Sequence, residues 1–415
     1  MTKDETLMKY FGYSSFRPAQ ESVVDAQLLG RDVLGVMPTG AGKSICFQIP
    51  ALMLSGATLV VSPLISLMKD QVFQLKRAGV PAAYINSSLT KKQYDEVLRR
   101  TKLGLYKIIY IAPERLETED FIRFALDAEI SLIAVDEAHC VSQWGQDFRP
   151  SYLRVDAFVK RLHKRPTIAA FTATATKDVK KDIIRLLDLQ NPFSLTTGFD
   201  RPNLYFGVEK PKNKPVFFHE YIAGRADDCG VVYCSTRKTV DSVTGELRRR
   251  GVAALRYHAG LEDEERRVNQ DAFISNKARV IVATNAFGMG IDKPDVRYVV
   301  HYNMPKNLES YYQEAGRAGR DGKPSECILL FSEEDIRVSE YLSRGDRNIK
   351  ELTEAQQKKV EYRDMIRLSK MIRYCEVDSC LRSYIMGYFG EKKKGGCGNC
   401  SSCNRPNFWQ RVKKR

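Results

Sequence analysis

The stretch "DVLGVMPTGAGKS" at positions 32–44 joins a short apolar run to a glycine-rich loop and the start of a helical pattern. The run is apolar without alternation, which is typical of a strand covered on both faces of a parallel sheet. Gly40 and Gly42 would let backbone N–H groups wrap phosphates at the N-terminus of the following helix. The stretch therefore predicts an α/β fold with a phosphate-binding strand–loop–helix unit.

Two side chains at the end of this loop have the chemistry that a nucleotide needs. Lys43 is expected to reach the β- and γ-phosphates, and Ser44 to hold Mg²⁺. The strict pattern has a glycine five residues before Gly42, where this chain has Met37. The alternative is a tight turn without a ligand. The predicted cradle consists of Thr39, Gly40, Ala41, Gly42, Lys43 and Ser44.

Similar apolar runs recur in two sets along the chain. Segments such as 64–79, with a helical period and a glycine at the end, lie between them and indicate βαβ units. The Lys- and Pro-rich stretch 208–216 separates the sets and is interpreted as a linker. We therefore predict two α/β lobes, 1–207 and 208–340, followed by a small helical domain, 341–415. The predicted strands lie at 32–37, 58–62, 107–112, 131–136 and 167–172, and at 230–235, 252–257, 279–284, 297–302 and 327–331.

Charge and hydropathy narrow the class of protein. The 415-residue chain has a net charge of +15, which favours a polyanion such as nucleic acid as the partner. A generally basic enzyme is the alternative. Residues 341–415 contain 18 Lys and Arg against 8 Asp and Glu, which is +10 of the +15. No apolar stretch is long enough to span a membrane and no signal peptide precedes the first lobe, so we expect an intracellular protein.

A pair of carboxylates ends another predicted strand in "AVDEAH" at 134–139. Asp136 is expected to bind Mg²⁺, and Glu137 to polarise the attacking water. The carboxyl ends of parallel strands lie on one edge of the sheet, where ligands bind. With the glycine-rich loop upstream, the pair predicts ATP hydrolysis.

The second lobe offers two arginines in "YYQEAGRAGRDG" at 311–322. Arg317 and Arg320 are three residues apart, which predicts one shared helical face. They fit a finger offered in cis to a γ-phosphate, whereas solvated surface arginines are the alternative. Gly290 and Asp292 end a further strand and are predicted to approach the nucleotide. A nucleotide clamped between two lobes that also grip a polymer predicts a motor.

Aromatic side chains follow closely behind the carboxylates. Trp144 and Phe148 are predicted to stack on bases of single-stranded DNA, and Arg149 to touch a phosphate. His139 is the expected transmitter between the two sites. The alternative is that Trp144 and Phe148 anchor the loop in the core, and Tyr152 is assigned to packing.

Five of the ten cysteines crowd near the C-terminus. Cys397, Cys400 and Cys403 form interlocking C-x-x-C turns of the kind that bind tetrahedral Zn²⁺. Cys375 lies on an apolar helical stripe and is assigned to the core. Cys380 stands at a helix start, where the dipole favours a thiolate, and is chosen as the fourth ligand. A structural zinc site is predicted, with a [4Fe–4S] cluster as the alternative.

The series of motifs resembles that of the RecQ-family DNA helicases of superfamily 2 over nearly the whole chain. Besides the segments quoted above, "FGYSSFRPAQ", "SPLISLMKDQV", "FTATAT", "YHAGL" and "ATNAFGMGIDKPDVR" stand in family order. The resemblance implies two RecA-like lobes and a zinc domain. It also implies that Tyr13, Arg17 and Gln20 contact the adenine or its neighbourhood, and that Arg320 is the finger, with Arg317 assisting.

The same resemblance implies ATP-dependent 3′–5′ unwinding in DNA recombination and repair. Expected substrates are single-stranded DNA and tailed or forked duplexes. Expected partners are single-strand-binding and recombination proteins. We expect a monomer, located in the cytoplasm at a bacterial nucleoid or in a nucleus. The family usually continues with a winged-helix domain, which this sequence lacks, and that puts strand separation in question. The alternatives are a nucleic-acid-stimulated ATPase without efficient unwinding and a non-enzymatic zinc-containing binding module.

Overall fold

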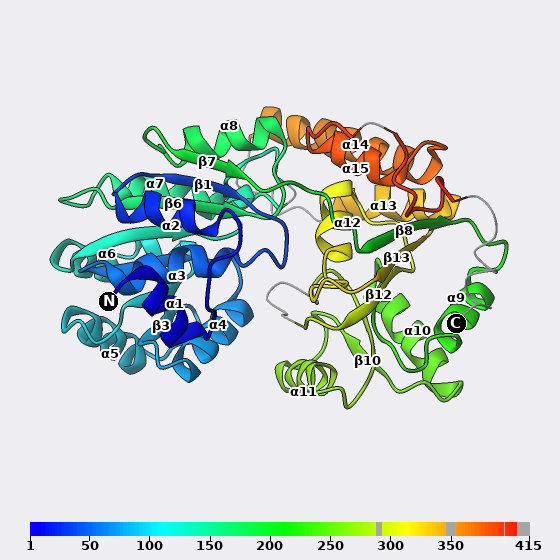
Figure 1. Cartoon of the computed structure of the whole chain (residues 1–415), viewed down its shortest axis with the longest axis horizontal. Coiled ribbons are helices and arrows are strands. Elements are labelled where there is room, and N and C mark those ends of the chain that lie inside the picture. Colours follow the sequence, from blue (N-terminus) through cyan, green and yellow to red (C-terminus); the bar gives the residue numbers. More distant parts are fainter. Residues whose placement is uncertain (146, 288–292, 346–352, 394, 405–415) are drawn as a thin grey trace. The chain divides into compact units, whose positions relative to one another are not determined.

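The computed structural model describes all residues except 146, 288–292, 346–352, 394 and 405–415. The chain divides into two compact units, Met1–Gly198 and Phe199–Arg415, each of which has its own parallel sheet. Figure 1 shows both units, with elements coloured from the N-terminus in blue to the C-terminus in red. No helix in the described ranges is both long and apolar enough to cross a membrane.

The first unit is built on a seven-stranded sheet in which every pairing is parallel. Three of its strands, Val33–Val36, Ala57–Val61 and Ile108–Ile111, are buried along their full length, which explains the apolar runs without alternation. In spatial order the strands are β3 (Ala82–Ile85), β4 (Ile108–Ile111), β2 (Ala57–Val61), β5 (Ile130–Val135), β6 (Thr167–Thr172), β1 (Val33–Val36) and β7 (Phe193–Thr196).

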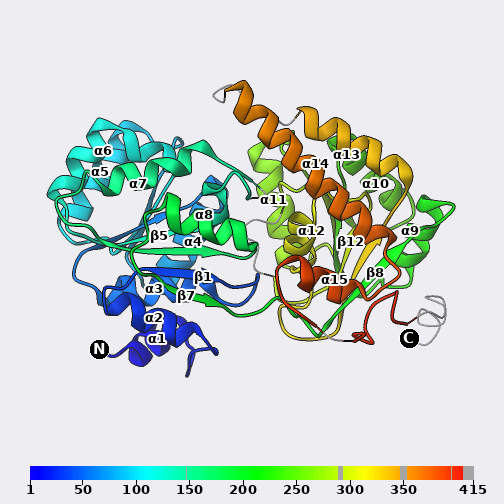
Figure 2. The same cartoon turned by 90° about the horizontal axis from the view of Figure 1, so that it is seen from above.

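Helices cover both faces of this sheet (Figure 2). The α-helices are α1 (Lys3–Phe11), α2 (Gln20–Leu28), α3 (Lys43–Met53), α4 (Ile65–Arg77), α5 (Lys91–Lys102), α6 (Glu119–Asp127), α7 (Arg154–Val159) and α8 (Lys177–Leu186). Three short 3-10 helices, η1 (Pro113–Glu117), η2 (Ala138–Val141) and η3 (Pro150–Leu153), lie in the connections.

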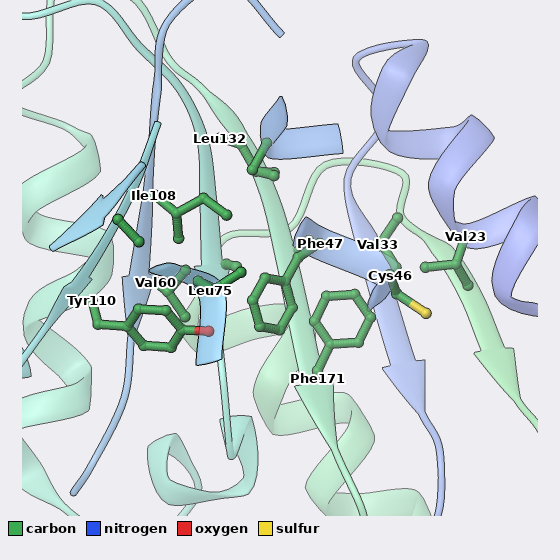
Figure 3. Packing of buried hydrophobic residues seen from close by; sticks show 14 of the residues in the cluster. Val23, Val33, Cys46, Phe47, Val60, Leu75, Ile108, Tyr110, Leu132 and Phe171 are labelled. Atoms are coloured by element: carbon green, nitrogen blue, oxygen red, sulfur yellow. The ribbon is translucent and has the colours of Figure 1, made fainter. Parts of the chain in front are cut away.

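The core of the first unit fixes the strand that leads into the glycine-rich loop. Phe47 on α3 packs against Phe171 on β6, with ring centroids 5.7 Å apart (Figure 3). A Cβ atom added at Gly35 on β1 would lie 2.7 Å from the Phe171 ring, so the glycine makes room for that ring. The same cluster contains Val33 and Met37, which places the loop directly above packed side chains.

The second unit contains a six-stranded sheet, again with every pairing parallel. In spatial order its strands are β10 (Ala254–Tyr257), β11 (Val280–Ala283), β9 (Cys229–Tyr233), β12 (Val296–His301), β13 (Ser325–Leu330) and β8 (Leu204–Glu209). The helices are α9 (Lys214–Ala223), α10 (Arg237–Arg249), α11 (Asp263–Ile274), α12 (Leu308–Ala315), α13 (Glu333–Gly345), α14 (Glu354–Glu376) and α15 (Leu381–Tyr388).

The C-terminal segment packs onto this second sheet at its edge strand. α14 lies against α12 and α13, and α15 against β8. Cys400 forms an isolated β-bridge with Phe206 on β8, where the Ser401 N–H donates to the Phe206 carbonyl at 2.9 Å. The helical cysteine segment is therefore part of the same compact unit as the second sheet.

All ten predicted strands are present, and no end is shifted by more than two residues. Three further strands, β3, β7 and β8, were not predicted. β8 spans the boundary that the sequence placed at 207/208, because its residues pair with β13. The division lies at 198/199 instead, and the expected linker 208–216 contains the end of β8 and the start of α9.

Candidate active site and metal centre

The glycine-rich loop lies between β1 and α3, as its sequence predicts. Gly40 and Gly42 have φ angles of 85° and 80°, in the left-handed region that favours glycine. α3 begins at Lys43, and the first N–H groups of a helix have no partner within the helix. Together with the helix dipole they favour an anion here. Each of the residues 39–44 is at least partly exposed, so the cradle is accessible to phosphates.

Side chains from the N-terminal segment hold the carbonyl groups of this loop. The Gln20 amide donates to the carbonyls of Ala41 and Gly42, each at 3.1 Å, and Arg17 Nη1 donates to the carbonyl of Gly40. Arg17 is exposed while Gln20 is buried. Tying these carbonyls back leaves the N–H side of the loop for a ligand. Tyr13, the third residue assigned to the base, is 53% exposed.

Met37 explains how the loop forms without the glycine of the strict pattern. Its side chain is buried in the core cluster below the loop. Its carbonyl accepts a hydrogen bond from Lys43 Nζ at 3.2 Å. Lys43 is thereby held above the loop, close to where the pattern places the phosphates.

The acidic pair directly follows β5. Glu137 has a φ of 48°, and its N–H donates to Asp136 Oδ1 at 2.9 Å. Burial and the neighbouring Glu137 charge raise the pKa of Asp136 to about 6, whereas Lys43 lowers it. The Lys43 ammonium is thus near enough to act on the carboxylate. The fold brings the loop and the acidic pair to one site, although 93 residues separate Lys43 from Asp136.

His139 connects the acidic pair to the end of β6. Its Nδ1 lies 3.3 Å from Glu137 Oε2 and 2.9 Å from Thr172 Oγ1. The Thr172 hydroxyl in turn donates to the Thr174 carbonyl at 3.0 Å. The imidazole is buried, so this path is shielded from water. The transmitter role of His139 stays a prediction.

The aromatic segment starts immediately after η2. The Ser142 hydroxyl donates to Asp182 Oδ2 at 2.7 Å and accepts the Trp144 N–H at 3.0 Å, which fixes the loop to α8. Trp144 is 49% exposed, so it is no core anchor, and Phe148 is half-buried. Tyr152 is fully buried, as predicted, and its hydroxyl donates to the Asp136 carbonyl at 3.1 Å.

Arg149 is engaged differently from its predicted contact with a phosphate. Its Nη1 donates to the Pro63 carbonyl at 2.7 Å, and its Nε and Nη2 both donate to Asp147 Oδ2. The side chain therefore ties the aromatic segment to the turn that follows β2. The sequence missed this contact because Pro63 is 86 residues away.

The two arginines of the second unit follow α12. The helix ends at Ala315, and successive turns carry Arg317 and Arg320. The prediction that they share a helical face is therefore wrong, because Gly319 has a φ of 54° and breaks the helical path. Arg317 is buried and Arg320 is half-buried. We name residues 316–320 the arginine turn.

Two further residues of the second unit contact the arginine turn and have no role in the sequence analysis. Arg201 and Asn203, just before β8, donate to carbonyls of the turn. Arg17 and Gln20 hold the glycine-rich loop in the same way. An arginine followed closely by a side-chain amide thus occurs before both turns, and this repeated pattern could have pointed to Arg201 and Asn203. Gly290 and Asp292, predicted to approach the nucleotide, lie outside the described residues.

The four predicted cysteine ligands converge in the second unit. The Sγ atoms of Cys380, Cys397, Cys400 and Cys403 all lie within 4.8 Å of one another. Tetrahedral Zn²⁺ with Zn–S bonds of about 2.3 Å requires sulfur atoms roughly 3.8 Å apart, so the set fits zinc. Cys375 is 3% exposed within the helical core, as predicted.

Local hydrogen bonds prepare this cysteine cluster for a cation. Cys380 is the N-cap of α15, and its Sγ accepts the Ser383 N–H at 3.4 Å. Burial opposes ionisation of Cys380, but hydrogen bonds from Ser383 and Cys397 lower the pKa of its thiol to about 6. Burial raises the pKa of Cys400 to about 12. A metal ion would therefore displace protons as it binds.

Comparisons with known proteins show the family to which the chain belongs. Residues 17–182 match the DEAD/DEAH box helicase family, 213–322 the helicase conserved C-terminal domain and 333–404 the RecQ zinc-binding family. The probable ATP-dependent DNA helicase RecS of Bacillus subtilis is 36% identical over 462 residues, covering 98% of this chain and 92% of that protein. The chain belongs to the RecQ family of helicases.

Other relatives bear the family name directly. The ATP-dependent DNA helicase RecQ of Bacillus subtilis is 47% identical over 398 residues, which cover 96% of this chain and 66% of that protein. The RecQ helicases of Pasteurella multocida and Haemophilus influenzae are covered to 62% and 63% of their length. This chain thus spans about two thirds of these RecQ relatives. The four cysteines of its cluster lie within residues 333–404, the range that matches the RecQ zinc-binding family.

The fold also resembles that of two solved structures with bound nucleic acid. Saccharomyces cerevisiae Dbp5 bound to RNA and ADP BeF3 has a TM-score of 0.66 and 20% identity, covering 87% of this chain and 97% of that chain. The helicase MrfA bound to DNA has a TM-score of 0.69 and 15% identity, covering 95% of this chain and 59% of that chain. These likenesses establish two RecA-like units.

Proposed function

We propose that this RecQ-family chain is an ATP-dependent DNA helicase that moves 3′ to 5′ on single-stranded DNA. One observation supports it above the others. In a single unit, Glu137 contacts both Asp136 and His139, and the same short segment continues into the exposed Trp144. A base stacked on Trp144 can therefore displace the residues that position the attacking water.

The hydrolytic step follows from charge and position. Lys43 neutralises the β- and γ-phosphates, and Glu137 orients the attacking water. Ser44 and Asp136 would hold Mg²⁺, which supplies a positive charge for the phosphate oxygens. A divalent cation would favour the ionised form of Asp136, whose pKa burial raises to about 6. Arg320, with Arg317 assisting, would stabilise the charge that develops on the γ-phosphate.

DNA would bind through stacking and through charge. Trp144 and Phe148 offer faces for successive bases, which is worth about 1–3 kcal/mol per base and tolerates any sequence. Arg149 would act indirectly, since its guanidinium holds the loop. Tailed or forked duplexes in recombination and repair are the substrates proposed for such a motor.

ATP hydrolysis measured with different polymers tests this proposal. Single-stranded DNA should raise kcat by at least tenfold, whereas RNA of equal length and base content should raise it less. In the control variant Lys43→Ala, the rate of ATP hydrolysis should fall by roughly 10³-fold with either polymer. Equal stimulation by RNA would contradict the DNA assignment, and an unchanged Lys43→Ala rate would contradict the enzymatic one.

A further inference from the structure

The carbonyl groups of the arginine turn converge on one guanidinium. Arg201 Nη1 donates to the carbonyl of Gly316 at 3.3 Å, and Nη2 donates to the carbonyls of Ala318 and Gly319 at 3.0 and 2.9 Å. These carbonyls precede and follow Arg317 in the chain. A planar guanidinium holds several acceptors in a fixed geometry, which an ammonium cannot do as well. Arg201 thereby sets the backbone path on which Arg317 and Arg320 depend.

An amide next to Arg201 closes the same turn. Asn203 Nδ2 donates to the carbonyls of Gly319 and Lys323, at 2.9 and 3.0 Å. A Cβ atom added at Gly319 would lie 2.5 Å from Asn203 Nδ2 and 2.7 Å from Ser325 Oγ. The turn is thus packed as well as hydrogen-bonded. A small displacement of Arg201 or Asn203 must therefore displace the turn.

The cysteine segment holds Arg201 from the other side. Arg382, on α15, is 3% exposed. Its Nη1 donates to Asp200 Oδ1 at 2.8 Å and to the Arg201 carbonyl at 2.5 Å, and Arg382 follows the predicted zinc ligand Cys380 by two residues. Asn399 Nδ2 adds hydrogen bonds to the carbonyls of Pro202 and Leu204.

Stacked rings complete the support. Phe199 and Phe389, which follows α15, stack with centroids 4.4 Å apart and an interplanar angle of 14°. Tyr312 on α12 packs against both rings, and its hydroxyl donates to the Phe199 carbonyl at 2.8 Å. Residues 199–204 therefore lie between the zinc-binding segment and the helix that carries the arginine turn.

We propose that Arg201 is a positioning residue for ATP hydrolysis, which fixes the arginine turn and is itself fixed by Arg382 next to the zinc ligands. This inference rests on the proposed role of Arg320 at the γ-phosphate. The zinc-binding segment would then contribute to the transition state through Arg382, which donates to the Arg201 carbonyl, in addition to stabilising the fold.

The expected effect is on kcat, because an arginine finger acts on charge that develops in the transition state. A displacement of about 1 Å can cost roughly 10²-fold in rate. Arg201→Ala should therefore lower the DNA-stimulated kcat by roughly 10- to 100-fold, with the KM for ATP changed less than about threefold. Arg201→Lys keeps the charge but loses the fork, and should give an intermediate kcat.

A matched control separates positioning from stability. Arg225 is a half-buried arginine of the same unit that donates to Glu326 and to the Tyr221 carbonyl, and within the described residues no hydrogen bond joins it to the arginine turn. Arg225→Ala should lower the melting temperature while keeping kcat per folded molecule. Binding of ADP with aluminium fluoride, a mimic of the transition state, should weaken with Arg201→Ala more than binding of ADP does.

Each result supports or overturns one of the two proposals. If Arg320→Ala keeps the parental kcat, the proposed finger fails. If Arg320→Ala loses activity while folded Arg201→Ala, with full zinc content, matches Arg225→Ala in kcat, the positioning role of Arg201 fails. Should Arg201→Ala not fold, an Arg201→Lys kcat equal to that of the parent would overturn the role as well. In an Arg320→Ala background, Arg201→Ala should add less than about a twofold loss.

Discussion

The glycine-rich loop of the first unit and the arginine turn of the second are built by the same device and braced differently. In each, an arginine and an amide that lie two or three residues apart donate to carbonyls of the turn, Arg17 with Gln20 and Arg201 with Asn203. A glycine packs against the amide in both turns, since an added Cβ would collide with it.

The difference lies in what holds the arginine. Arg17 is exposed, and with Tyr13 and Gln20 it is proposed to meet the base of the nucleotide. Arg201 is half-buried and contacts the zinc-binding segment through Arg382. A turn held by an exposed arginine can respond to the nucleotide, whereas a turn held from within the fold presents its arginines in one place.

Loss of a zinc ligand should give the largest difference between the two units. Cys400→Ala removes one of four thiolates, and structural zinc supplies folding energy directly. We expect the transition of the second unit to be lost in a melting curve and the zinc content to fall, while the first unit still binds ADP. Full zinc content and a parental melting curve in Cys400→Ala would contradict the site.

Trp144→Ala should sharpen the account of how the first unit responds to DNA. Basal ATP hydrolysis should persist, while stimulation by single-stranded DNA falls about tenfold or more, in line with stacking worth about 1–3 kcal/mol. Leu153→Ala, another exposed apolar residue of this region, is the control and should keep the stimulation. Stimulation that survives in Trp144→Ala would rule out the coupling.

Gln20→Ala should separate the two turns kinetically. Loosening the carbonyls of the glycine-rich loop weakens binding of ATP before the reaction, so KM should rise about fivefold with kcat changed less. Gln27→Ala is the control, because Gln27 lies on the same helix and its amide donates to the Cys46 carbonyl, not to the loop. A Gln20→Ala variant altered in kcat alone would mean that both turns act at the same step.

The smallest effect concerns Glu209 at the end of β8. Burial raises the pKa of Glu209 to about 7, so the folded chain binds a proton that the unfolded chain releases near pH 4.3. Stability should therefore fall as pH rises through this window. Glu209→Gln should raise the melting temperature at pH 8 by a few degrees and much less at pH 5, on the scale expected for domains of this size. The exposed Glu340→Gln should show no such pH dependence.

The parts of the fold and of the site that were predicted are those that a short stretch of sequence determines by itself. The buried parallel strands, the loop around Gly40 and Gly42, and the cysteine turns each require a particular residue pattern at short range. β7 was missed because only alternate positions along it are sheltered from solvent, so it has no continuous apolar run. The division of the chain was misplaced because β8 lacks a long apolar run.

Contacts across long stretches of sequence could not be predicted from a pattern. Arg149 bonds a carbonyl 86 residues away, and Arg201 bonds carbonyls 115 to 118 residues away. An arginine carries no local mark of which acceptor the fold brings to it. The break of the helix at Gly319 could not be predicted either. An added Cβ there would collide with Asn203, which lies far away in the sequence.

Unwinding of tailed duplexes tests the central claim most directly. Fluorescently labelled duplexes with a 3′ or a 5′ single-stranded tail would be incubated with the chain and ATP, with Lys43→Ala as the inactive control. We predict ATP-dependent strand separation of the 3′-tailed duplex alone. Separation of the 5′-tailed duplex alone would contradict the direction of movement, and DNA-stimulated hydrolysis without any strand separation would contradict the helicase assignment.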